Sequence, residues 1–265
     1  MKKKAIILIL YFIFLLIPIY WMLNTSFKTN MEIQSKITFI PQKFTFHNYK
    51  HILTSPVWQK SFLDVFEYVT LNVIIVLVSA IPAAYAFSRW KWRGSHHLFF
   101  WLLTNRMAPG AAFMVPMFIL FSALKLFDTI IAVALAHCLF NLPLAIWILE
   151  GFMRGIPKEI DETAFIDGYS FIRFFIKIFL PLISQGIGVT AFFCFMFSWV
   201  ELLLSRTLTS ANVKPITVAL SRSLGAGGWD WGVIAAAGVL TMIPGIIVIY
   251  FVRNFIVKGF SMGRV

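Results

Sequence analysis

Long apolar runs dominate the hydrophobic pattern of this chain, and each run is long enough to cross a membrane as a helix. Spanning a hydrocarbon core of about 30 Å takes roughly 20 mostly apolar residues in an α-helix. A transmembrane barrel would instead show alternating strands of about ten residues, whereas the runs here are continuous. The pattern therefore predicts an all-α integral membrane protein. Its six spans are expected near residues 5–27, 65–88, 98–124, 129–152, 182–204 and 231–255.

The composition excludes the ordinary soluble classes. Of the 265 residues, 60% are hydrophobic and only 13% are charged, against roughly 25% charged in a typical soluble domain. A soluble fold of this composition would expose large apolar patches. The two cysteines, Cys138 and Cys194, lie in apolar runs without the spacing of a metal site or a disulfide framework. We therefore expect one transmembrane domain over residues 1–265.

The positive charges beside the spans predict the orientation. Three lysines at positions 2–4 precede the first span, and Arg89–Arg93 form a short basic link after the second. Lys and Arg in short loops favour the cytoplasmic side, so both termini are expected in the cytoplasm. The net charge of +12 also favours contact with anionic lipid headgroups. Nucleic acid is not an expected partner, because the sequence shows no soluble basic face with stacking aromatics.

The segment 28–64 is polar and lies on the expected extracytoplasmic side. It contains Pro41, Pro56 and the aromatic run Phe44–Tyr49. Aromatic residues are typical anchors at the membrane interface, which favours an irregular loop. The alternative is that the segment forms part of a docking surface for an external partner.

The segment 153–181, between the fourth and fifth spans, is predicted to form two short helices joined by a turn. Pro157 suits the first helical position, and three acidic residues follow it, near the positive end of the helix dipole. The pattern predicts a helix of about three turns over residues 157–167. The exposed apolar stripe of this helix is expected to consist of Ile160, Ala164 and Phe165.

The turn after this helix is predicted in some detail. Gly168 suits the left-handed residue that ends a helix, and Ser170 can cap a second helix that runs to Leu180. Asp167 is unfavourable at a helix C-terminus, so its side chain is expected to accept hydrogen bonds from the backbone that follows. Such a turn would fix the angle between a surface helix and a transmembrane helix. The exposed stripe would suit a groove on another protein.

These residues carry a resemblance to a known family. The run of Glu162, Thr163 and Ala164, followed by Asp167, Gly168 and Tyr169, resembles the EAA loop of permease subunits in binding-protein-dependent ABC importers. Thr163 and Tyr169 stand where the family pattern has alanines.

Further motifs extend the resemblance over most of the chain. The basic link at Arg89–Gly94 is similar to a loop of maltose-type permeases, and Trp199 with Glu201 resembles a W-x-E motif of their fifth span. Arg106, Pro109 and Pro116 resemble the R-M-x-P motif of their third span. The ending K-G-F-S-M-G-R-V resembles permeases of glycerol and glycerol-phosphate importers.

The resemblance implies a fold, a location and a set of partners. It implies the type I ABC importer permease fold, with six transmembrane helices and a cytoplasmic coupling helix, in the bacterial inner membrane. The implied partners are a second permease subunit, two cytoplasmic ATPase subunits and an extracytoplasmic solute-binding protein. The loop of residues 162–169 would couple to the ATPase. The transported solute would be a small carbohydrate or a polyol, such as glycerol, glycerol phosphate or a sugar.

Two charged residues lie inside predicted spans. A charge near the bilayer centre costs about 2.5–3.5 kcal/mol on insertion scales, so Arg106 and Glu201 should face protein or a water-filled path. They either line the transport pathway or pair with a neighbouring helix. Pro109 and Pro116 interrupt the third span, and the freed backbone groups either line a cavity or form a packing kink.

Other polar residues and missing motifs narrow the function. His137 and Asn141, one turn apart, are more typical of hydrogen bonding between helices than of a metal site. The chain has no G-x-x-x-x-G-K-[ST] motif, so ATP and Mg²⁺ are expected in the partner ATPases, and no cofactor on this chain. It is therefore not expected to be an enzyme. The alternative function is a self-sufficient secondary transporter or channel, with its sites at broken helices.

Overall fold

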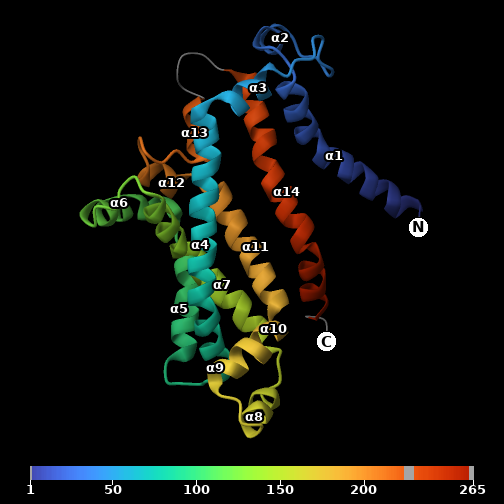
Figure 1. The fold of residues 1–265 in the computed structure, drawn as a ribbon. Helices are drawn as coiled ribbons and strands as arrows, with labels where there is room; N and C mark the ends of the chain where they lie inside the picture. Colours follow the sequence, from blue (N-terminus) through green and yellow to red (C-terminus); the bar gives the residue numbers. More distant parts are fainter. Residues whose placement is uncertain (1, 224–229, 263–265) are drawn as a thin grey trace. The chain divides into compact units, whose positions relative to one another are not determined.

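The computed structural model describes the backbone of residues 2–223 and 230–262, and the side chains of residues 5–221 and 230–253. Within these ranges every regular element is helical (Figure 1). The chain packs as two compact units: Met1–Leu63 with Lys214–Ile246, and Asp64–Val213 with Ile247–Val265. One domain over residues 1–265 stays a prediction. The last three residues of the K-G-F-S-M-G-R-V ending lie outside the described ranges.

Unit 1 is built from helical segments in two separate parts of the sequence. Its helices are α1 (Lys2–Ser26), α2 (Asn30–Ser35), α3 (His47–Thr54), the start of α4 (Pro56–Arg89), α13 (Ile216–Ser223) and the start of α14 (Trp231–Met262). The segment 28–64 therefore contains two short helices and the first turns of α4. Its interpretation as an irregular loop is wrong.

Buried polar side chains give this segment its order. The Glu32 carboxylate accepts hydrogen bonds from the Thr38 hydroxyl at 2.8 Å and the Gln42 backbone N–H at 2.9 Å. The bond from Gln42 is the largest of the effects that hold the pKa of Glu32 below its usual value. The Asn48 amide donates to the backbone carbonyls of Ser26 and Lys28 at 2.8 and 2.9 Å. These bonds satisfy backbone groups that the turns between short helices leave open.

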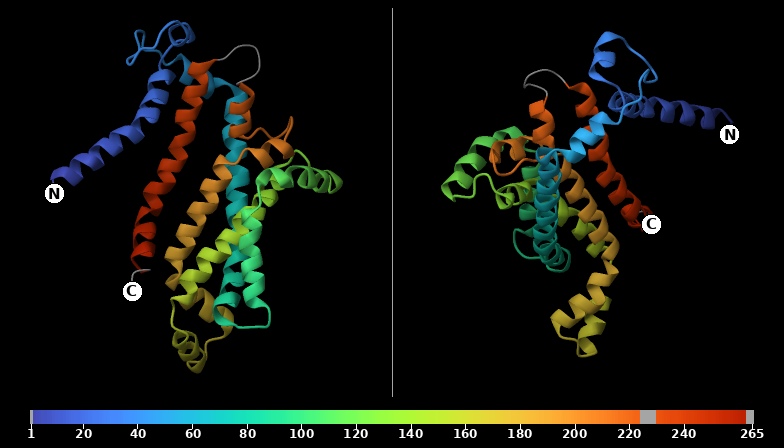
Figure 2. Two further views of the ribbon diagram at one scale, coloured as in Figure 1. Left: turned by 180° about the vertical axis from the view of Figure 1, so that it is seen from behind. Right: turned by 45° about the horizontal axis from the view of Figure 1, so that its top comes forward.

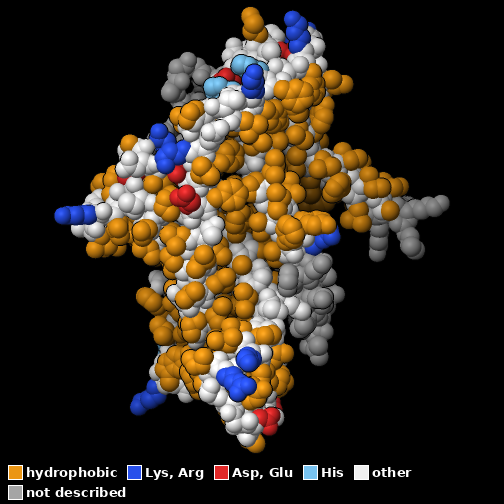
Figure 3. Space-filling view, viewed as in Figure 1, with side chains coloured by type: hydrophobic (Ala, Val, Ile, Leu, Met, Phe, Trp, Pro, Cys, Tyr) orange, Lys and Arg blue, Asp and Glu red, His pale blue; other side chains and the backbone are white. Residues whose placement is uncertain are grey.

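Unit 2 contains the rest of α4 and the helices that follow it. They are α5 (Ser95–Met107), η1 (Gly110–Phe113), α6 (Met114–Ala123), α7 (Ile130–Arg154), α8 (Glu159–Ile166), α9 (Phe171–Phe174), a π-helical turn η2 (Phe175–Phe179), α10 (Leu180–Leu182), α11 (Ser184–Val200) and α12 (Leu203–Leu208). The central helix is α7, which packs against both α5 and α11. Hydrophobic side chains cover most of the face shown in Figure 3, as expected where lipid is the solvent.

Four of the predicted spans coincide with unbroken helices. In the described part of the chain, the helices long and apolar enough to cross a membrane unbroken are Ala5–Ser26, Pro56–Arg89, Ile130–Arg154 and Trp231–Arg253. They match the expected spans near 5–27, 65–88, 129–152 and 231–255. Local hydrophobicity was sufficient to predict them because each run exceeds the length of a spanning helix.

The third span is not the single helix expected over residues 98–124. Helix α5 ends at Met107, and the helical segment Gly110–Ala123 is bent from it by 97° (Figure 2). Pro109 has no backbone N–H and excludes the residue before it from helical geometry. Ala108 accordingly adopts an extended conformation with φ −66° and ψ 137°. The prolines therefore divide the predicted span into two helices of different direction.

The fifth span also differs from its prediction of residues 182–204. The segment Phe171–Leu182 and helix α11 are bent by 73° relative to each other, with Ile183 between them. Pro181 clashes with the carbonyl four residues earlier in a regular helix. The backbone hydrogen bonds there change to the wider π-helical pattern, in which the Leu180 N–H bonds the carbonyl of Phe175, five residues earlier. Helix α11 then stops at Val200 because Glu201 is extended.

Candidate functional site

Helix α8 lies beyond the ends of its neighbours α7 and α9 in unit 2 (Figure 1). It ends in a Schellman motif, in which the Gly168 N–H bonds the Phe165 carbonyl at 3.1 Å and the Tyr169 N–H bonds the Ala164 carbonyl at 3.0 Å. Gly168 has a φ of +81°, which confirms its predicted left-handed conformation. The helix is shorter than the predicted 157–167, because Pro157 and Lys158 precede its first turn.

The exposed face of α8 differs from the predicted stripe. Phe165 is 45% exposed and Ile166 is 85% exposed, but Ala164 is buried and Ile160 is half-buried. Ala164 belongs to the apolar core of unit 2, together with Phe174 and other large side chains. The predicted exposed stripe is therefore wrong for Ile160 and Ala164, which face the rest of the unit, and right for Phe165. Glu162, Thr163 and Tyr169 complete the loop, with only Tyr169 half-buried.

The predicted contacts of Asp167 are also wrong. Asp167 is exposed at the C-cap position of α8, and its carboxylate makes no hydrogen bond within the described residues. The Schellman motif already uses the N–H groups of Gly168 and Tyr169. Ser170 does occupy the N-cap position of α9, but its side chain makes no capping bond.

A buried ion pair connects α8 to the end of α4. One edge of the Arg89 guanidinium faces the Asp161 carboxylate, with Nε at 2.9 Å from Oδ2 and Nη2 at 3.0 Å from Oδ1. The Tyr85 hydroxyl donates a third bond to Oδ2 at 2.9 Å. Both members of the pair are buried, and the Arg89 guanidinium lies 5.1 Å from the centroid of the Phe179 ring.

The same arginine also reaches the end of α7. Its Nη1 donates to the backbone carbonyls of Met153 at 3.3 Å and Ile156 at 2.9 Å. These carbonyls lie at the C-terminus of α7 and just beyond it, where helical partners run out. Arg89 therefore bonds α4, α7 and α8 together at one point. We call Tyr85, Arg89 and Asp161 the α8 clamp.

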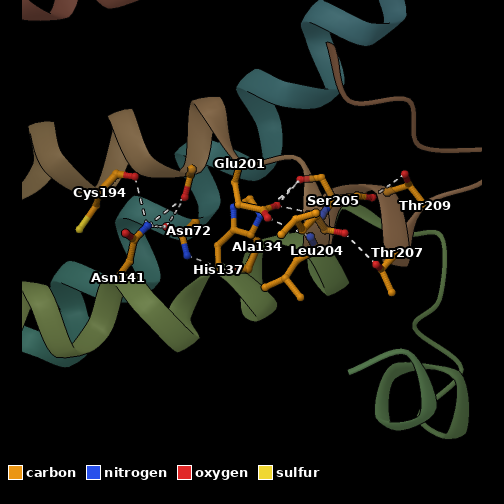
Figure 4. A network of polar contacts seen from close by, with 12 residues as sticks. Asn72, Ala134, His137, Asn141, Cys194, Glu201, Leu204, Ser205, Thr207 and Thr209 are labelled. Carbon is orange, nitrogen blue, oxygen red and sulfur yellow. Dashed lines mark hydrogen bonds and ion pairs between the residues drawn. The ribbon is translucent and has the colours of Figure 1, made fainter. Parts of the chain in front are cut away.

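A second polar cluster lies inside unit 2, where α4, α7 and α11 meet (Figure 4). The Asn141 amide nitrogen lies 2.7 Å from Asn72 Oδ1, 2.9 Å from the Ser198 hydroxyl and 3.1 Å from the Cys194 carbonyl. Asn72 in turn donates to the Ala134 carbonyl at 2.8 Å. The prediction that Asn141 bonds between helices is confirmed. We call Asn72, Asn141 and Ser198 the asparagine hub.

Glu201 lies near the hub and is bound on several sides. Its carboxylate lies 3.1 Å from His137 Nε2 and accepts hydrogen bonds from the backbone N–H groups of Leu204 and Ser205, each at 2.9 Å. These two N–H groups open helix α12, where a carboxylate is favourable. The geometry therefore favours the second of the two expected roles, a pairing between elements. His137 likewise bonds across helices, as predicted.

The remaining pathway candidates lie at the bend between α5 and α6. Arg106 is half-buried in the last turn of α5, donates to the Phe140 carbonyl at 2.6 Å and lies 4.5 Å from the centroid of the Phe197 ring. Pro109 and Pro116 are both exposed. The structure thus brings Arg106 against α7 and α11.

Comparison with known proteins identifies the family. A family model described as "Binding-protein-dependent transport system inner membrane component" matches residues 76–262. The chain belongs to this family. The permease is 30% identical to the trehalose transport system permease protein SugB of Mycobacterium tuberculosis, over 94% of this chain and 92% of that protein. It is also 30% identical to the osmoprotective compounds uptake permease protein GgtD of Synechocystis, over 92% of this chain and 81% of that protein.

A solved structure shares the fold of the permease. The crystal structure of a bacterial ABC transporter involved in alginate import matches with a TM-score of 0.82, over 96% of this chain and 94% of that chain, at 20% identity. The predicted ABC importer permease fold is confirmed.

Asp128 holds a loop of the permease that the sequence did not single out. It has a left-handed backbone with φ 62°, which Asp tolerates better than most residues. Its carboxylate accepts four backbone N–H bonds, at 2.8 to 3.0 Å, from residues 210–213 after α12. Burial by itself would raise the pKa of Asp128, but these four bonds stabilise the charged form and lower its pKa overall.

Acid is expected to release this loop. The pKa of Asp128 is lower in the folded permease than the value of about 3.9 in an unfolded chain. The stabilisation is therefore complete above about pH 5 and lost as the pH falls through the lowered pKa. Amide hydrogen exchange of residues 210–213, corrected for intrinsic rate, should be slow at pH 7 and become severalfold faster as the pH falls towards 3. An Asp128→Asn variant should exchange rapidly at both pH values, and an equally pH-sensitive variant would contradict the assignment.

The α8 clamp is not predictable from the local sequence. There Arg89 is one residue of a basic link, and Asp161 is one of the three acidic residues that follow Pro157. The two residues are 72 positions apart, so no local pattern pairs them. The available signal was an arginine at the very end of a span, since its head must find a partner when it is not exposed to water.

Proposed function

We propose that the permease is one membrane subunit of an ATP-driven importer in the bacterial inner membrane. The observation that carries the proposal is the exposed end of α8, where Phe165 and Ile166 are uncovered on a helix that is bonded firmly to the membrane helices beside it. An uncovered apolar helix end suits a groove on a partner protein. In this proposal the loop of Glu162, Thr163, Ala164, Asp167, Gly168 and Tyr169 docks on a cytoplasmic ATPase subunit, and both chain termini lie in the cytoplasm.

The partners complete the transport cycle. Two ATPase subunits bind ATP and Mg²⁺, a second permease subunit supplies the other half of the pathway, and an extracytoplasmic solute-binding protein delivers the solute. Closure of the ATPase pair moves α8, and the helices joined to α8 tilt with it. This chain supplies binding and movement, and the nucleotide chemistry takes place on its partners.

The solute in this proposal is a small carbohydrate or a polyol. The names of the relatives support a sugar or an osmoprotective compound, since one is a trehalose permease and another takes up diacetylchitobiose. The ending of the chain supports glycerol or glycerol phosphate as the finer possibility. Arg106, Pro109 and Pro116, at the bend of the third span, are the residues that we place along the pathway, while Glu201 acts between helices.

Cysteine crosslinking tests the proposal. Ile166→Cys places a thiol on the exposed end of α8, and Val78→Cys, 69% exposed within α4, is the matched control. In membranes that contain the full transport system, a short bifunctional thiol reagent should join the Ile166 position, and not the Val78 position, to a nucleotide-hydrolysing subunit. Solute uptake by the purified chain alone in liposomes, with no such crosslink, would favour a self-sufficient transporter instead.

A further inference from the structure

The α8 clamp offers a route for force that the exposed loop alone does not provide. The loop of residues 162–169 can receive a push from a partner, but its turn into α9 rests on backbone bonds at Gly168 and Tyr169. The clamp adds a second attachment at the opposite end of α8, in its first turn. The geometry points to Arg89 and Asp161 as the joint that makes α4 and α7 move with α8. This inference rests on the proposed function.

The form of the pair suits a rigid joint. The planar guanidinium meets the carboxylate through two parallel bonds, which fixes its orientation as well as its distance. Tyr85 holds the same carboxylate from the side, and its ring packs edge-on against Phe179 with centroids 4.8 Å apart. Well-packed apolar residues often stabilise a protein as much as a buried ion pair does. The directional bonds therefore point to positioning as the purpose of the pair.

The joint is also braced from the side of α8. The Lys158 ammonium, one residue before α8, donates to the Arg89 backbone carbonyl at 3.2 Å. Of the two carbonyls that Arg89 holds beyond the ion pair, one lies in the last turn of α7 and the other just after it. Rotation of α8 away from α4 would break at once the bonds that Asp161 and Lys158 make to α4. Movement of the three helices as a body keeps every one of them.

The joint connects to the interior of the permease through α4. Asn72 of the asparagine hub lies 17 residues before Arg89 on the same helix, which is about 25 Å along its axis. Asn141 connects the hub to α7 and α11. A displacement at α8 therefore reaches the middle of the membrane helices along one continuous helix that is bonded at both points.

The test separates transport coupling from assembly. Asp161→Asn removes the charge with almost no change of shape, and Arg89→Lys keeps the charge but loses the two-pronged contact. Arg93→Lys is the matched control, because Arg93 is exposed in the following link. Each variant is placed in the complete importer in proteoliposomes. The measurements are recovery of the ATPase with the tagged permease, ATP hydrolysis with loaded solute-binding protein, and solute taken up per ATP hydrolysed.

We expect both clamp variants to recover the ATPase normally and to take up at least fivefold less solute per ATP, with Arg93→Lys unchanged. The double variant Arg89→Asp with Asp161→Arg, which restores opposite charges, should regain part of the lost uptake. Uptake per ATP within twofold of wild type in both assembled single variants would overturn the inference. If they fail to assemble, Tyr85→Phe decides: a fall of at least twofold supports the joint, and no change overturns it. Failure of the unaltered chain to recover any ATPase would instead refute the proposed function.

Discussion

Replacement of Gly168 by valine is expected to reduce solute uptake by the assembled importer at least tenfold. Gly168 has a φ of +81°, and a residue with a Cβ pays roughly 1–2 kcal/mol in this conformation, more when the side chain is β-branched. No atom lies within 4 Å of the position that a Cβ would take, so the cost comes from the backbone alone. Relief of this strain would break the two bonds of the Schellman motif and turn α8 relative to α9.

Two variants serve as controls for this prediction. Gly168→Asn should keep most of the uptake, because asparagine tolerates the left-handed conformation. Gly151→Ala lies within α7, has no atom within 4 Å of its new Cβ and should be neutral. Uptake is measured with radiolabelled solute in proteoliposomes, beside recovery of the ATPase. Wild-type uptake by Gly168→Val would show that the turn is not required.

Replacement of Asn141 by leucine is expected to destabilise the permease by about 1–3 kcal/mol. Hydrogen bonds between membrane helices contribute on average about 0.6 kcal/mol and at most about 1.7 kcal/mol each. Asn141 bonds both α4 and α11, so leucine removes more than one of them. It also leaves the Asn72 side-chain oxygen and the Cys194 carbonyl with fewer donors. An unsatisfied buried polar group adds to the cost.

Unfolding in mixed micelles with increasing SDS measures this loss. The Asn141→Leu variant should unfold at a lower SDS fraction than the wild-type permease. Asn105→Leu is the matched control, because Asn105 is half-buried in α5 and its side chain makes no hydrogen bond within the described residues. The role of the asparagine hub would be contradicted if the two variants unfolded at the same SDS fraction.

The sequence predicted those features that depend on neighbouring residues. The four unbroken spans follow from the length of single apolar runs, and the conformation of Gly168 follows from its place at the end of one helix. The bends in the third and fifth spans are harder to predict. The sequence shows Pro109 and Pro181, but whether a proline kinks a helix or ends it depends on which neighbours satisfy the freed backbone groups. Those neighbours come from distant parts of the chain.

The sequence predicts where the candidate loop lies, but it does not predict how α8 is held against the other helices. Residues 162–169 form a short exposed helix and turn, as expected. The inward side of α8 depends on Ala164 packing into a core with Phe174, and that core forms only when the helices assemble. For the same reason Asn141 was predicted to bond between helices, while its partners Asn72 and Ser198 could not be named.

The π-helical turn at residues 175–179 allows this segment to lose one residue more easily than to gain one. The bond from Leu180 to Phe175 spans one residue more than a regular α-helix needs, so the ladder could close without that residue. Removing one residue there would let the turn close as a regular α-helix, whereas removing one from a regular helix would turn everything after it by about 100°. A single-codon deletion is therefore absorbed more readily in this turn than in the regular helices on either side of it.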